Sequence, residues 1–178
     1  QDSSSVEVIE QLFLGLTDYD PKTYEVIPEL ATKWSASADS RTYTFEMRKD
    51  VFWSDGVPVT AHDIEYAIRR NINPETASPY AYALYILEGA EAINKGESKD
   101  FNSLGVRAVD DYTVEFRLTQ PAGFFPAMAG LWTYRPLPRR SIEAFGTAWT
   151  EPEHILTNGS YRLATWEKGN QLILKRNP

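Results

Sequence analysis

Cysteine is absent from this sequence of 178 residues, and histidine occurs only at His62 and His154. Without cysteine the chain has no disulfide framework, no zinc site with cysteine ligands and no cysteine nucleophile. A metal site with two histidines would need both of the histidines present, and we expect no metal site. Long apolar runs are missing too, because no segment approaches the ~20 apolar residues that a membrane-spanning helix needs.

Basic residues are in the minority. The sequence has 18 Lys and Arg residues against 25 Asp and Glu residues, which gives a net charge of −7. No dense basic run stands out, and we expect no nucleic acid partner, because binding to a phosphate backbone depends on clustered positive charge. Hydrophobic residues make up 42% of the chain and aromatic residues 13%. This content is enough for a substantial core and argues against disorder as the main state.

The common motifs of catalysis and nucleotide binding are also missing. The sequence contains no Gly-x-Ser-x-Gly elbow, no phosphate-binding loop ending in Gly-Lys-Ser/Thr and no Gly-x-Gly-x-x-Gly. Asp55, His62 and Asp63 could bind a metal or exchange protons, but Asp55 is typical of a turn and Asp63 of a helix start. Paired acids such as Glu151 and Glu153 leave a glycosidase as a third-ranked alternative. We expect no enzymatic activity and no cofactor.

Helical and strand patterns occur in mixed order. Apolar residues spaced three and four apart predict helices at residues 6–16, 61–71, 82–93 and 139–145. Alternating apolar residues and turn signals predict strands at residues 42–48, 106–109, 113–118, 161–166 and 171–175. Because strands and helices do not alternate regularly, the pattern favours an α+β fold over a parallel doubly wound fold.

Several segments, taken in order, resemble one protein family. They are PELATKW at 28–34, YTFEMR at 43–48, WSDGVPVTAHD at 53–63, NPETASPYA at 73–81, LGVRAVDD at 104–111 and TNGSYRL at 157–163. Together they are similar to the substrate-binding components of bacterial oligopeptide ABC importers, the extracellular solute-binding proteins of family 5, which is the peptide and nickel class. The resemblance covers nearly the whole chain and matches the amino-terminal part of such proteins.

The resemblance implies a fold and a domain arrangement. The fold would be α+β, with mixed sheets and packed helices, as in a fragment of a periplasmic binding protein type II-like lobe that carries the extra subdomain of the peptide-binding class. Residues 1–178 would form a single fragment of the amino-terminal lobe. Residues 20–135 would form the extra subdomain, and residues 1–19 and 136–178 would be pieces of lobe one.

The resemblance also implies a function. Members of the family enclose an extended peptide between two lobes, so the expected ligand is an oligopeptide and the expected partner is the membrane permease of an ABC importer, reached through the full-length protein. The expected location is periplasmic or extracytoplasmic, with a lipid anchor on the full-length protein as one arrangement. The alternative is a ligand-sensing or interaction domain that reuses the solute-binding lobe.

Four residues are candidates for ligand binding by resemblance. The tyrosine after Ser-Pro contacts the peptide in the family, which corresponds to Tyr80, and the segment ahead of the first helix runs along the ligand, which corresponds to Gln1 and Ser3. Trp132 is included because it stands next to Leu131, where the family can present a polar side chain near the cleft. For Tyr80 the alternative is a packing residue at a helix start, because a loop aromatic near a cleft serves either role.

Overall fold

The computed structural model describes residues 3–177, with the side chains of residues 3 and 4 excluded. The chain divides into two compact units. The first comprises residues 1–14, 49–59 and 138–178, and the second comprises residues 15–48 and 60–137. Residues 49–59 thus group with the first unit, whereas the expected subdomain 20–135 included them. The assignment of either unit to a lobe stays a prediction.

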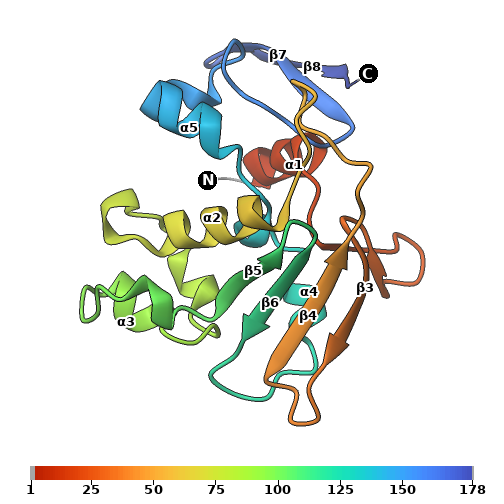
Figure 1. Cartoon of the computed structure of the whole chain (residues 1–178). Helices are drawn as coiled ribbons and strands as arrows, with labels where there is room; N and C mark the ends of the chain where they lie inside the picture. The colour runs from red at the N-terminus through yellow and green to blue at the C-terminus, as the bar shows by residue number, and fades with distance from the viewer. Residues whose placement is uncertain (1–2, 178) are drawn as a thin grey trace. The chain divides into compact units, whose positions relative to one another are not determined.

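A four-stranded antiparallel sheet with the order β3-β4-β6-β5 forms the frame of the second unit (Figure 1). Its strands are β3 (Ala31–Ala36), β4 (Thr42–Met47), β5 (Val106–Asp110) and β6 (Thr113–Arg117). A short hairpin, β1 (Thr17–Tyr19) with β2 (Val26–Pro28), belongs to the same unit. In β4 the alternating residues Tyr43, Phe45 and Met47 are buried. The strands expected at residues 42–48, 106–109 and 113–118, and the pairing of the last two, are confirmed.

Aromatic rings fill the core of this unit. Phe45 and Phe116 lie edge to face with centroids 5.7 Å apart, and Phe125 lies 5.2 Å from Phe116. Phe125 belongs to α4 (Phe125–Met128) and also contacts Tyr134 at 5.9 Å. All four rings are fully buried. Edge-to-face packing adds to the stabilisation that burial of these rings supplies.

Helix α2 (Ala61–Ile72) begins and ends close to where the sequence predicts. Its buried positions Ile64, Ile68 and Ile72 recur every four residues, and α2 packs against β5, as Figure 1 shows. At its first turn the Asp63 carboxylate accepts a hydrogen bond of 2.9 Å from the backbone amide of Thr60, which is the N-cap residue. The predicted helix start is therefore confirmed.

The helix expected at residues 82–93 is not continuous. The segment contains a 3₁₀ turn, η2 (Ala81–Leu84), and a short helix, α3 (Ala90–Asn94), with Gly89 between them at a φ of 70°. The Glu88 amide donates to the carbonyl of Arg117 at 3.0 Å, and the Glu88 carbonyl accepts from the Gly105 amide at 2.8 Å. These bonds to distant residues, with the isolated bridge between Leu87 and Leu118, hold the chain in turns at a point where local periodicity predicts a helix. The unit also contains η1 (Pro74–Thr76), η3 (Phe101–Ser103) and η4 (Trp132–Tyr134).

The first unit combines two helices with a two-stranded ribbon. Its elements are α1 (Ser3–Leu12), α5 (Arg139–Phe145), the 3₁₀ helix η5 (Gly146–Thr150), β7 (Tyr161–Glu167) and β8 (Gln171–Arg176). β7 and β8 pair antiparallel, as the blue ribbon in Figure 1 shows, and the predicted hairpin is confirmed. Helix α5 ends as expected at Gly146, whose φ is 55°. Within residues 3–177, no helix combines the length and apolar character that crossing a membrane requires.

Helix α1 ends four residues earlier than its apolar spacing predicts. It stops at Leu12 instead of Leu16. The backbone amides of Asn158 and Gly159 donate to the Leu12 carbonyl at 3.2 and 2.9 Å, and the Leu14 amide donates to the Asn158 side chain at 3.1 Å. The carbonyl at the helix end is thus satisfied by a segment far along the chain.

Candidate functional site

Three aromatic side chains of the second unit form a row with Tyr80 in the middle, called here the aromatic row. Tyr80 lies edge to face with Trp132, with ring centroids 5.8 Å apart and an angle of 87° between the planes. On its other side Tyr82 lies at 6.2 Å and 42°. Tyr80 and Trp132 are half-buried, whereas Tyr82 is 63% exposed. The row therefore offers aromatic surface that the described residues do not cover.

The turns that carry the aromatic row are fixed by buried groups. The Tyr134 hydroxyl donates to the Ala83 carbonyl at 3.2 Å, which joins η4 to η2. Burial raises the pKa of Tyr134 well above its usual range, so this hydroxyl stays protonated and acts as a donor. The Asn71 side chain of α2 donates to the Thr133 carbonyl at 3.3 Å. The backbone under the rings is thus held in place before any ligand arrives.

Two polar atoms beside the aromatic row lack hydrogen-bond partners. The Trp132 indole nitrogen and the Thr133 hydroxyl are buried and make no hydrogen bond in the described part of the chain. A buried donor without an acceptor costs about 1–3 kcal/mol, and most such groups in folded proteins are satisfied. A buried group of this kind calls for an explanation, and a ligand that supplies the missing partner is one, which makes η4 a candidate part of a site.

The structure brings together two of the four candidate residues. Tyr80 and Trp132 are in contact, although 52 positions separate them in the sequence. Ser3 is the first residue of α1 in the first unit, and Gln1 lies outside the described residues. Tyr80 precedes η2 and packs on Trp132 while part of its surface stays exposed. Both interpretations of Tyr80, ligand contact and packing residue, therefore stay open.

The sequence does not mark Tyr82 as a site residue. Its spacing with Ile86 and Ile93 predicts a helix, but the structure places Tyr82 on the η2 turn with its ring 63% exposed. No motif distinguishes Tyr82 from a core tyrosine, and only the position of Tyr80 beside it draws attention to it.

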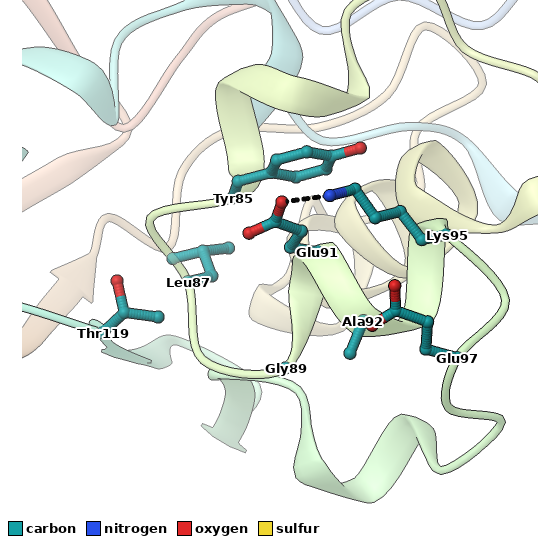
Figure 2. Close-up of a pocket in the computed structure, with 8 residues that line it drawn as sticks. All are labelled: Tyr85, Leu87, Gly89, Glu91, Ala92, Lys95, Glu97 and Thr119. Atoms are coloured by element: carbon teal, nitrogen blue, oxygen red, sulfur yellow. Dashed lines mark hydrogen bonds and ion pairs between the residues drawn. The ribbon is translucent and has the colours of Figure 1, made fainter.

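A hollow of about 430 Å³ beside α3 has no polar groups that converge on a ligand. Figure 2 shows the Glu91–Lys95 ion pair, 2.6 Å long, below the ring of Tyr85. The hydrogen bond that Lys95 donates to the Glu91 carboxylate raises the pKa of Lys95, so the ammonium stays charged and paired. The Tyr85 hydroxyl donates to Asn94 at 2.7 Å, and the Thr119 hydroxyl donates to a backbone carbonyl at 3.2 Å. Each of these four side chains thus already has a hydrogen-bond or ion-pair partner within the protein.

The motif at residues 53–63 and the motif at residues 157–163 meet inside the first unit. The Ser54 amide donates to the Thr157 carbonyl at 2.8 Å, and the Thr157 amide donates to the Ser54 hydroxyl at 3.2 Å. Asp55 forms a two-point ion pair with Arg140 of α5. Burial acts to raise the pKa of Asp55, but hydrogen bonds from Arg140 and the Val57 amide outweigh it and lower that pKa. These motif residues hold the unit together.

The residues considered for metal binding each have such a structural partner. Asp55 pairs with Arg140, Asp63 accepts from Thr60 at the start of α2, and His62 lies 3.3 Å from Asp111 at an exposed position. Across residues 3–177, no group of three or more His, Asp or Glu side chains is arranged to hold a metal ion.

Comparison with known proteins identifies a family. Residues 25–178 match the family described as "Bacterial extracellular solute-binding proteins, family 5 Middle". The periplasmic oligopeptide-binding protein OppA of Escherichia coli K12 is 39% identical over 173 residues, which cover 96% of this chain and 31% of that protein. The probable deoxycholate-binding periplasmic protein YgiS of the same strain is 34% identical over 180 residues, which cover 100% of this chain and 33% of that protein.

A solved structure gives the same result for the fold. Haemophilus influenzae OppA in complex with the peptide RPPGFSPFR is 37% identical, with a TM-score of 0.94 over 100% of this chain and 35% of that chain. The expected α+β fold, similar to that of periplasmic binding proteins, is confirmed. This chain spans about a third of the length of the relatives that it matches.

Proposed function

This chain belongs to the bacterial extracellular solute-binding proteins of family 5, and from this membership we propose that it takes part in capturing oligopeptides for an ABC importer. The full natural protein would bind the peptide in the periplasm or another extracytoplasmic location and deliver it to a membrane permease. The role is binding without chemical change of the ligand, so the chain is proposed not to be an enzyme.

The observation that carries this proposal is the aromatic row, found in a chain whose relatives include oligopeptide-binding proteins. Rings with polar tips provide large contact area and lose little conformational entropy on binding, and such residues dominate the energy of many interfaces. Tyr80 and Trp132 present partly exposed rings on turns fixed by Tyr134. We propose that the peptide contacts these two rings. Gln1 and Ser3 stay ligand-binding candidates by family resemblance alone.

The test is Tyr80→Ala in the full natural protein, with peptide binding and stability measured on the same variant. Loss of a ring contact should weaken the binding of tri- to pentapeptides by ~1 to 2 kcal/mol, which is about 5- to 30-fold in Kd. A buried packing ring would instead cost about 3–5 kcal/mol of folding stability. Calorimetry gives the first quantity and urea unfolding the second.

The matched control is Tyr24→Ala, which removes a tyrosine that is 78% exposed and lies outside the aromatic row. It should change neither peptide affinity nor stability beyond error. If Tyr80→Ala lowers stability strongly while the folded fraction binds peptide as tightly as the wild type, Tyr80 is a packing residue and the proposed contact is wrong.

The similarity to YgiS favours a second candidate ligand, an amphipathic steroid such as deoxycholate, because the apolar face of a steroid also packs on aromatic side chains. Titration of deoxycholate into the same protein, with and without a tripeptide, separates the candidates. Binding of deoxycholate together with no binding of peptides would replace the peptide proposal. The alternative of a sensing domain has the same binding surface, and a fused DNA-binding or kinase region in the gene would identify it.

A further inference from the structure

Tyr82 presents the most exposed ring of the aromatic row. Its side chain is 63% exposed, and its hydroxyl has no hydrogen-bond partner within residues 3–177. Its ring touches Tyr80, whose far side touches Trp132. The row therefore ends at Tyr82 in a ring whose surface and polar tip are both open to a ligand.

The backbone beneath Tyr82 is firmly held. Its neighbours in η2, Ala81 and Leu84, are buried, with Leu84 completely inaccessible to solvent. The Ala83 carbonyl accepts the hydrogen bond from the buried Tyr134 hydroxyl. Because the inner side of the turn is anchored in the core, Tyr82 is displayed outward on a rigid support. The backbone of the turn therefore does not need to become ordered when a ligand binds, and preorganisation of this kind favours affinity and selectivity.

We propose that Tyr82 selects peptides that carry an aromatic side chain next to the residue that contacts Tyr80. This inference rests on the proposed peptide-binding function and adds a selectivity to it. An aromatic side chain stacked on Tyr82 gains from offset or edge-to-face contact and also removes apolar surface of both rings from water. A lysine or arginine gains less than an aromatic side chain here, because a cation over an exposed ring keeps most of its hydration.

The experiment measures selectivity in the full natural protein with a panel of tripeptides. Trialanine is compared by calorimetry with peptides in which one alanine at a time is replaced by phenylalanine, cyclohexylalanine or lysine. Cyclohexylalanine has a similar apolar size to phenylalanine but no aromatic ring. At one position the wild type should prefer phenylalanine over cyclohexylalanine by about 2- to 13-fold, the range that an aromatic pair contributes.

Two substitutions assign this preference to Tyr82. Tyr82→Phe should retain the ratio, whereas Tyr82→Ala should reduce it to near one. Tyr24→Ala, which removes an exposed tyrosine outside the row, should leave the ratio as in the wild type. Urea unfolding of each variant is measured in parallel, because a ligand-contacting ring can be removed without a large change in the unfolding midpoint.

The outcomes separate the two proposals. If the wild type binds none of the peptides, the proposed function fails. If the wild type binds peptides but Tyr82→Ala keeps the preference for phenylalanine, or the preference is for lysine, the function stands and the role of Tyr82 is wrong. If Tyr82→Ala lowers the unfolding midpoint as a core truncation does, Tyr82 is covered by protein and the inference also falls.

Discussion

Gly159 shows how a single residue determines where a helix ends. A Cβ atom at this position would lie 2.6 Å from the Gln11 carbonyl oxygen and 2.8 Å from the Leu12 carbonyl carbon. The close approach lets the amides of Asn158 and Gly159 reach the Leu12 carbonyl and satisfy it. Glycine is needed here because of the neighbouring backbone, since backbone atoms cannot rotate away as a flexible side chain can.

Replacing Gly159 should therefore destabilise the protein. We expect Gly159→Ala to lower the free energy of unfolding by about 1–3 kcal/mol, the usual cost of forcing extra volume into a packed site. Gly123→Ala is the control, because a Cβ atom at Gly123 would meet nothing within 4 Å. Urea unfolding of both variants is the measurement, and equal midpoints for the two would show that the contact at Gly159 relaxes without cost.

Among the elements, those with strong local signals were predictable from the sequence. Helix α2 has buried isoleucines every four residues and an acid at its first turn, and β4 alternates strictly, so both follow from local rules. Helix α1 and the segment around Gly89 depend instead on hydrogen bonds to residues 158–159, 105 and 117. Such long-range hydrogen bonds cannot be predicted from the local spacing of apolar residues.

The same contrast holds for the candidate site. Tyr80 was found because a motif surrounds it, and its contact with Trp132 could not be predicted because it depends on how η2 and η4 pack together. Tyr82 lies in the segment 82–93, where apolar spacing predicts a helix, and the structure places it on the η2 turn with its ring 63% exposed. Local spacing therefore predicts neither the break in the helix nor the exposure of Tyr82.

The first turn of α2 gives a prediction for an element. Asp63→Ala should destabilise the protein by ~1 kcal/mol, because it removes the acceptor for the Thr60 amide and a negative charge at the helix start. His62→Ala in the same turn is the control. It removes only an exposed contact with Asp111, which should change stability by less than about 0.5 kcal/mol. A cost for Asp63→Ala no larger than for His62→Ala in urea unfolding would contradict the capping role.

At the scale of the whole molecule, this chain covers only about a third of the length of its relatives. This coverage bears on how tightly the chain alone is expected to bind a peptide. The chain spans 31% of Escherichia coli OppA and 35% of the Haemophilus influenzae OppA chain solved with a peptide. A tight small-ligand site buries about 70–90% of the ligand surface, which a single partly exposed row of rings does not achieve. We therefore expect the 178 residues alone to supply one wall of the proposed peptide site.

The resulting prediction compares the 178-residue chain with the full natural protein. Calorimetry with the same tri- to pentapeptides should give clear binding for the full protein and a Kd at least ~100-fold weaker for the chain alone, because losing half of the buried contacts removes several kcal/mol. Circular dichroism and urea unfolding must first show that the chain alone is folded, since an unfolded chain would also fail to bind. Sub-micromolar binding by the folded chain would mean that the aromatic row and its surroundings form a complete site, and the two-walled arrangement would then be wrong.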